Sequence, residues 1–221
     1  MVKTWSDDNP KAALMSRKRA MIVDAALRAF LENGYAESSV NRIAEEAGVS
    51  IKTLYRHFES KDDLFSAVME AACSTPGTQP VSATGLAGTD EPDWFSAPPP
   101  VALPIAGSEY LRHALSEEQL ALYRVVTRDA PRFPELARRY REQITGTRDA
   151  LFASYLDRWL PVTGWKVKDK YGAAATFAAL LKAALFDDAL FGVTSASDDE
   201  IASCARHAAI QVLALMEAGR L

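Results

Sequence analysis

The chain has 221 residues, 48% of them hydrophobic, and a formal net charge of −4 at neutral pH. This length and apolar content suit one small and one larger buried core, while the acidic balance argues against a protein that coats nucleic acid nonspecifically. Two isolated cysteines exclude a disulfide scaffold and favour a reduced, cytoplasmic protein.

Secretion and membrane spanning are not expected. The first residues lack an apolar signal core, and nowhere do about 18 uncharged apolar residues follow one another. We expect residues 1–16 to form a flexible tail.

A first amphipathic helix is predicted over about 16–33. Apolar residues recur there at spacings of three and four, and Asn33-Gly34 is a typical left-handed helix end. Ser39 can cap a second helix, which carries Ile43 and Ala44 on one face and ends at Gly48.

Ser50 can cap a third helix, and Ser60 with Asp63 three residues later has the spacing of a capping box for a fourth. In the third helix, Leu54 and Phe58 lie four residues apart and point inward. The outward positions are rich in hydrogen-bond donors: Lys52, Thr53, Tyr55, Arg56 and His57. Two short helices joined by a glycine turn, the second polar outside, indicate a helix-turn-helix.

Residues 17–65 resemble the DNA-binding domain of the TetR family of bacterial transcriptional repressors. The segments that carry the resemblance are Ala29-Phe30, Gly34-Tyr35, Ile43–Ser50 and Thr53–Leu64. Many matches in fixed register make this resemblance more specific than a bare helix-turn-helix.

The resemblance implies two groups of DNA contacts. Phosphate contacts are expected from Ser39, Tyr55, His57 and Lys61. Base contacts in the major groove are expected from Asn41, Arg42, Ile51, Lys52, Thr53 and Arg56, and Ser50 completes the predicted DNA-binding set. Arginine and lysine can donate to guanine, asparagine can pair with adenine, and apolar groups can meet a thymine methyl.

The chain departs from the family pattern at residues that are expected to determine which DNA sequence is bound. Many relatives carry lysine and glycine where this chain has Ile51-Lys52, and arginine where it has Asn41. The operator sequence therefore stays open. Two alternatives also stay open: Tyr55 and His57 could pack against the first helix, and Arg17–Arg19 could be either a solvated helix start or a phosphate or minor-groove contact.

Residues 66–221 are predicted to form a helical ligand-binding and dimerisation domain. Residues 74–107 are rich in Pro, Gly, Ser and Thr and are expected to form a loop. Helices should then begin at Ser108 and at Ser116, followed by a long helix over about 134–160. The segment Leu122–Leu136 resembles the regulatory domain of the AcrR-like branch of the same family.

The two last helices, predicted over 169–191 and 198–218, are apolar on more than one face. In the resembling family this pair forms a four-helix bundle with a twofold mate, which implies a homodimer. The dimer contacts expected are Phe177, Ala184, Leu185, Ala205, Ala209 and Val212. The alternative is a wholly intramolecular core.

A mostly apolar effector pocket is expected within this helical domain. Its predicted lining is His113, Tyr123, Thr127, Phe152, Tyr155, Trp159, Phe177 and Leu181.

The sequence thus predicts an all-α DNA-binding regulator without cofactor or metal. It would act as a repressor, bind a near-palindromic operator as a homodimer, and be released by a small hydrophobic effector. Two rivals are a regulator controlled by a protein partner and an all-helical enzyme. The enzyme is disfavoured because three scattered histidines and the lack of HExxH, paired CxxC or a phosphate-binding loop leave little catalytic material.

Overall fold

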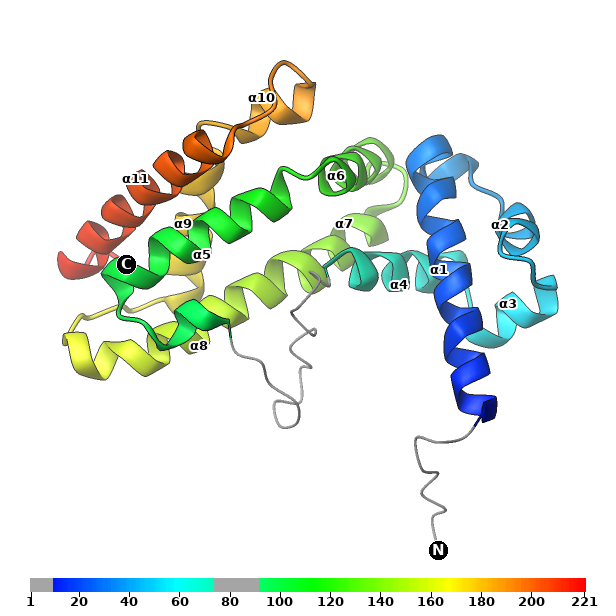
Figure 1. The fold of residues 1–221 in the computed structure, drawn as a ribbon, viewed down its shortest axis with the longest axis horizontal. Helices are drawn as coiled ribbons and strands as arrows, with labels where there is room; N and C mark the ends of the chain where they lie inside the picture. The colour runs from blue at the N-terminus through cyan, green and yellow to red at the C-terminus, as the bar shows by residue number, and fades with distance from the viewer. Residues whose placement is uncertain (1–9, 74–91) are drawn as a thin grey trace, which may run out of the picture. The chain divides into compact units, whose positions relative to one another are not determined.

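The computed structural model describes residues 10–73 and 92–221, and every regular element within these ranges is helical, as the sequence predicts (Figure 1). The chain divides into two compact units. The first comprises residues up to Ala72 together with Val125–Tyr140, and the second comprises Cys73–Arg124 and Arg141–Leu221. One of the boundaries between the units therefore falls inside a helix, α6 (Glu117–Asp129).

The first unit contains four consecutive helices and a later insertion. Its elements are α1 (Pro10–Glu37), α2 (Val40–Glu46), α3 (Ile51–His57), α4 (Lys61–Cys73), the end of α6 (Glu117–Asp129) and α7 (Pro134–Tyr140). Its core includes Phe30 and Phe65, whose rings meet edge to face with centroids 5.1 Å apart. Leu54 and Phe58 are each only 1% exposed, which confirms the inward stripe predicted for α3.

Helix α1 is longer than predicted. It begins at Pro10, so the second half of the expected tail is helical, and residues 1–9 lie outside the described residues. Near its end the helix is interrupted at Gly34, whose φ of 77° and ψ of 176° are not helical. The predicted end at Asn33-Gly34 is thus a kink, and a last short helical stretch, Tyr35–Glu37, follows it. Residues 33–38 are called the turn between α1 and α2 below.

Three of the predicted helix caps form, and one does not. The Ser50 hydroxyl accepts the Thr53 N–H at 3.1 Å, and Ser60 accepts the Asp63 N–H at 3.0 Å. Ser116 likewise accepts the Gln119 N–H at 3.3 Å. Ser39 stands at the cap position of α2 with extended backbone, yet its side chain makes no capping bond.

The second unit contains the remaining helices. Its elements are η1 (Asp93–Ser96, a 3-10 helix), α5 (Pro99–Ala114), the first part of α6, η2 (Arg141–Thr145, a π-helix), α8 (Gly146–Thr163), α9 (Lys170–Lys182), α10 (Phe186–Phe191) and α11 (Asp198–Glu217). Helix α11 packs along α5 and α9, and α9 packs on α8 (Figure 1). Small residues such as Ala173, Ala205 and Ala209 are buried at these contacts. Their short side chains let the helices approach closely.

The predicted loop over 74–107 is wrong for its last part. Helix α5 begins at Pro99, since proline is well tolerated in the first turn of a helix, where its missing N–H costs nothing. Pro104 lies inside α5, and the Ser108 hydroxyl donates to its carbonyl at 2.9 Å. The helix expected to start at Ser108 is therefore the second half of α5, and residues 74–91 lie outside the described residues.

Two predicted long helices are divided. The 134–160 segment consists of α7 and α8 joined by the π-helix, and α8 ends at Gly164, whose φ of 72° is left-handed. The 169–191 segment breaks at Ala183–Leu185 into α9 and α10. Among the described residues, no helix is both long and apolar enough to cross a membrane.

Candidate nucleic-acid interface

One face of helix α3 is buried against its own unit, and the opposite face is exposed. The Ser50 cap fixes its start, and buried Leu54 fixes its rotation. Ile51 and Tyr55 are 37% and 52% exposed, so the outer face of α3 carries apolar surface as well as charge. Lys52 and Arg56 are exposed beside them, so α3 presents two cations and two apolar groups outward.

Two predicted base-contacting residues lie on α2, where both are exposed. Asn41 is free to reach outward, while Arg42 forms an exposed pair with Glu46 at 3.4 Å, one helical turn away. An exposed pair of this kind contributes little free energy, so it does not prevent Arg42 from turning to another acceptor.

The side chains of Thr53 and His57 are less accessible to DNA than predicted. The Thr53 hydroxyl is 2.9 Å from the Ser50 hydroxyl and half-buried. His57 is also half-buried; its Nε2 atom is shielded from solvent and has no hydrogen-bond partner among the described residues. The pKa of His57 is lowered by burial and then by the nearby charges of Arg56, Arg19 and Lys18.

Lys61, a predicted phosphate contact, also binds within its own unit. Its Nζ donates to the Ala36 carbonyl at 3.2 Å and lies 4.6 Å from the centre of the Tyr35 ring. Burial lowers the pKa of Lys61, although the carboxylates of Asp129, Glu37 and Asp62 oppose that shift. Lys61 is half-buried, and its amine binds the turn after α1; the phosphate contact expected of it stays a prediction.

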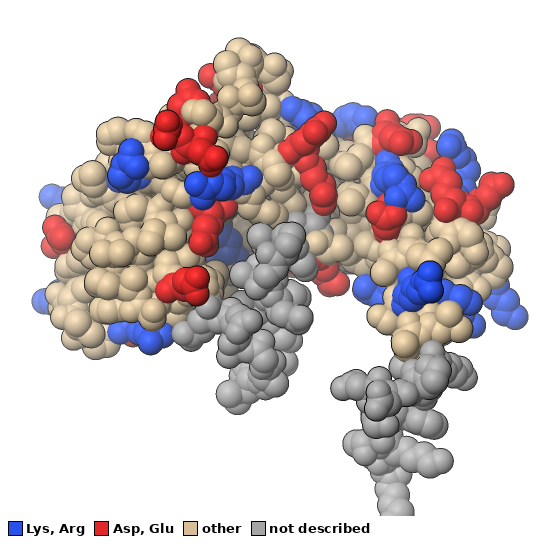
Figure 2. Space-filling model, viewed as in Figure 1, with Lys and Arg blue, Asp and Glu red and all other residues tan. Residues whose placement is uncertain are grey.

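Basic side chains gather near α3. Figure 2 shows Lys and Arg concentrated at the lower end of the first unit, where Figure 1 places α3 and the beginning of α1. Arg17 and Arg19 are exposed there, and the Arg56 guanidinium approaches the sulfur of Met15 at 3.7 Å. A local cationic surface of this kind can attract a phosphate backbone despite the negative net charge of the chain.

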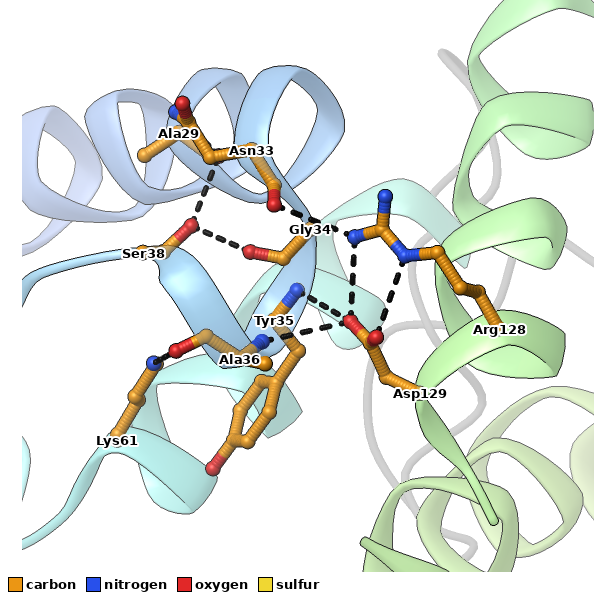
Figure 3. Close-up of polar contacts among 9 residues, drawn as sticks. All are labelled: Ala29, Asn33, Gly34, Tyr35, Ala36, Ser38, Lys61, Arg128 and Asp129. Carbon is orange, nitrogen blue, oxygen red and sulfur yellow. Dashed lines mark hydrogen bonds and ion pairs between the residues drawn. The ribbon is translucent and has the colours of Figure 1, made fainter. Parts of the chain in front are cut away.

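The turn between α1 and α2 is bound by a pair of residues from the end of α6, which the sequence did not single out (Figure 3). The Asp129 carboxylate accepts the backbone N–H groups of Tyr35 at 2.6 Å and Ala36 at 3.4 Å. Burial alone would raise the pKa of Asp129, but hydrogen bonds from Arg128, Tyr35 and Ala36 outweigh it and lower the pKa. No sequence signal pointed to this pair, because it acts across more than 90 residues.

The predicted pocket residues do not form one group. Five lie in the core of the second unit: Phe152, Tyr155, Trp159, Phe177 and Leu181. Tyr123 packs instead on Phe186 in a separate small cluster, and Thr127 is exposed on the part of α6 that belongs to the first unit. His113 is half-buried near the end of α5, and burial lowers its pKa.

Trp94 and Phe95 fill part of the expected pocket. Both rings meet Tyr155 edge to face with centroids 5.5 Å apart, and the Tyr155 hydroxyl donates to the Ala97 carbonyl at 2.8 Å. The described part of the second unit also has a surface groove of about 710 Å³ elsewhere, along α5, α6, α10 and the segment before α11. Its lining includes Arg112, Leu120 and Arg124.

The predicted dimer contacts also need correction. Phe177, Ala205, Ala209 and Val212 are at most 5% exposed because their own chain covers them, so their side chains are not available to a second copy. Ala184 is exposed and Leu185 is half-buried. The outer face of α11 instead carries Ile210, which is 64% exposed, and the outer face of α9 carries Tyr171, which is 58% exposed.

Within the described residues, no group of three or more His, Cys, Asp or Glu side chains is arranged to hold a metal ion.

Comparisons with known protein families give two matches that together span most of the chain. The model for bacterial regulatory proteins of the tetR family matches residues 22–68, and the model for the C-terminal domain of AefR-like transcriptional repressors matches residues 102–215. The second match alone covers more than half of the chain.

Curated proteins and solved structures agree with these matches. The chain is 28% identical over 137 residues to the HTH-type transcriptional repressor Rv1474c of Mycobacterium tuberculosis, covering 59% of this chain and 73% of that protein. It is 42% identical over 59 residues to the regulator AcrR of Shigella flexneri, covering 27% of each. The structure of the flavonoid-responsive regulator FrrA superposes with a TM-score of 0.70 at 26% identity, covering 90% of this chain and 96% of that one.

A second solved structure extends this agreement. A TetR-family regulator from Mesorhizobium loti gives a TM-score of 0.67 at 25% identity, covering 91% of this chain and 97% of that one. The similar proteins are transcriptional regulators and not enzymes.

Proposed function

Because the chain belongs to the TetR family of DNA-binding transcriptional regulators, we propose that it is a repressor that binds a near-palindromic operator as a homodimer and leaves it when a small hydrophobic effector binds. The observation that carries this proposal is the two-sided character of α3. Its inner face is locked by Leu54, and its outer face offers Lys52 and Arg56 as donors. Such a helix suits the major groove.

The proposed division of DNA contacts differs slightly from that expected from the sequence. Ile51, Lys52 and Arg56 on α3, with Asn41 and Arg42 on α2, are exposed and suited to base edges. Tyr55 and Ser39 are exposed and suited to phosphates. Thr53 and Ser50 support the start of α3 through their mutual hydrogen bond.

The homodimer proposal rests on the family and on the outer faces of α9 and α11. Exposed small or apolar residues on these faces are Tyr171, Ala175, Ala179, Ile210 and Ala214. A twofold pairing through these helices would give two copies of α3, and recognition helices about one DNA turn (roughly 34 Å) apart can read a near-palindrome.

The effector proposal rests on the aromatic interior of the second unit. Phe152, Tyr155 and Phe177 lie together there with Trp94 and Phe95, so a ligand that binds among them would be apolar and aromatic. The description of FrrA as flavonoid-responsive supports an effector of this kind. The ligand would lower DNA affinity through its preference for a conformer that fits the operator poorly. We place the protein in the cytoplasm.

Selection of fragments from genomic DNA, followed by footprinting and titration with salt, tests the DNA-binding part of this proposal. We expect one near-palindromic site whose affinity falls steeply as salt rises. Lys52→Ala should weaken this site more than other sequences, while Lys182→Ala on α9 serves as a control. If no fragment is selected above background, the repressor proposal fails; if a thermal-shift screen of hydrophobic aromatics finds no stabilising compound, control by a protein partner is favoured.

A further inference from the structure

We infer that Arg128 and Asp129 are positioning residues for operator binding: they hold the turn between α1 and α2, and thereby the helix-turn-helix, without touching DNA. The inference rests on the proposed function, because it concerns the affinity for the operator. It goes beyond the family match, which assigns residues 102–215 to the C-terminal domain, whereas Val125–Tyr140 packs as part of the first unit.

Asp129 binds the amide side of the turn. Its carboxylate is buried, with the side chain 8% exposed, and it accepts N–H bonds from Tyr35 and Ala36. These two amides directly follow the kink at Gly34. A carboxylate is well suited to this place, because a charged acceptor can serve two donors at once.

Arg128 binds the carbonyl side of the same turn. Its Nη2 donates to the Asn33 carbonyl at 3.3 Å and to the Asp129 carboxylate at 3.3 Å (Figure 3). The guanidinium occupies the space beside Gly34 where a side chain would otherwise lie. Asp129 and Arg128 thus bind the N–H groups and a carbonyl of the same turn, and their own opposite charges form an ion pair.

Helix α4 holds the turn from another direction. Lys61 donates to the Ala36 carbonyl and stacks on Tyr35, whose hydroxyl bonds to Asp62. The Tyr35 ring also meets Phe133, from the segment after α6, with centroids 5.1 Å apart. The turn is consequently fixed between α4 and the 125–140 segment, and each provides a polar anchor.

The position of the reading helices depends on this turn. Ser38 ends it, and its buried hydroxyl is placed to bond the carbonyls of Ala29 at 2.8 Å and Gly34 at 2.6 Å. Ser39 and α2 follow at once, and α2 packs on both α1 and α3. A turn released from Asp129 would let α2 and α3 shift together relative to α1, which lowers affinity for a rigid DNA groove because the protein must be re-ordered on binding.

Three variants test the inference. Asp129→Ala removes both acceptors, Asp129→Asn keeps one amide oxygen as an acceptor, and Asp24→Asn makes the same charge change on the exposed face of α1 as a matched control. The operator Kd is measured at a temperature where circular dichroism shows each variant fully folded. Hydrogen exchange of peptides covering 33–38 is followed on the same samples.

We expect Asp129→Ala to weaken operator binding by about 10-fold or more, Asp129→Asn by less, and Asp24→Asn by under about 3-fold. Exchange at the Tyr35 and Ala36 amides should accelerate in the same order. A purely stabilising role would lower the melting temperature and leave the Kd of the folded protein unchanged, which would overturn the inference. Should Asp129→Ala fail to fold, the Asp129→Asn variant decides by the same two readouts.

The two proposals fail in different ways. Wild-type protein that selects no DNA would overturn the proposed function. Wild-type protein that binds its operator, with both Asp129 variants binding equally well, would overturn only the positioning role.

Discussion

The guanidinium of Arg128 takes the place of a side chain at Gly34: a Cβ at residue 34 would stand 1.0 Å from Nη2 of Arg128. The glycine also has a φ of 77° with ψ near 180°, a region that only glycine adopts readily. The backbone therefore favours glycine, and a Cβ would also displace the end of the Arg128 side chain from its bonds.

Gly34→Ala should destabilise the fold by more than backbone strain alone, which is about 1–3 kcal/mol. Gly48→Ala is the matched comparison, because Gly48 has a φ of 65° but no atom near its Cβ direction. Chemical denaturation of both variants measures the difference. In an Arg128→Ala background, Gly34→Ala should cost only the backbone strain; a loss as large without Arg128 as with it would show that the clash is unimportant.

Ser50→Ala should destabilise the protein by roughly 0.5–2 kcal/mol, because the Thr53 N–H loses its capping oxygen. Ser39→Ala should cost less, since Ser39 makes no capping bond. Urea denaturation compares the two. Equal losses would mean that the cap observed at Ser50 does not stabilise α3.

Tyr155→Phe should cost about 1 kcal/mol, because the buried hydroxyl leaves the Ala97 carbonyl without its donor. Tyr171→Phe, at an exposed position on α9, should cost little. The measurement is the urea midpoint at constant slope. A neutral Tyr155→Phe would indicate that water replaces the hydroxyl and that this side of the aromatic cluster is accessible.

Stability should fall as the pH drops below about 6.5, the ordinary pKa of histidine. The pKa values of His57 and His113 are both lowered in the fold, so between the lowered value and 6.5 the unfolded chain binds more protons than the folded one. This contribution is complete above pH 6.5 and lost towards acid, with a slope of at most about 1.4 kcal/mol per pH unit for each group. Denaturation between pH 5 and 8 should show a shallower slope in His57→Gln and in His113→Gln; unchanged slopes in both would refute the assignment.

Ile210→Glu should shift the protein from dimer to monomer, because a charge would be introduced into the proposed contact between copies. Val162→Glu, at a residue 73% exposed near the end of α8, is the control and should leave the mass unchanged. Light scattering after size-exclusion chromatography gives the masses. If the Ile210→Glu protein stays dimeric, the outer face of α11 is not the interface.

Most of the local structure could be predicted from neighbouring residues. The Ser50 and Ser60 caps, the glycine turn at Gly48 and the inward pair Leu54 and Phe58 each depend on contacts within one or two helical turns. Composition alone does not predict the helix start at Pro99, because proline is frequent in loops and is also favourable in the first turn of a helix.

The candidate site could be predicted only in part. The sequence placed Lys52, Tyr55 and Arg56 on an outer face, since a helix of seven residues with one buried stripe leaves few other orientations. The bond from the Lys61 amine to a carbonyl 25 residues away could not be predicted, because periodicity carries no information about such a contact.

The sequence by itself determined the helical content, the two-faced α3 and the family, because each follows from short-range patterns in fixed register. Tertiary structure alone decided which chain segments complete the first unit: Asp129 reaches Tyr35 across 94 positions and joins 125–140 to the helices around α3. It also decided that Ala205, Ala209 and Val212 face inward, since α11 is apolar on several sides and only packing against α5 and α9 selects which side is covered. Both features depend on packing between residues far apart in the sequence, which a local pattern does not record.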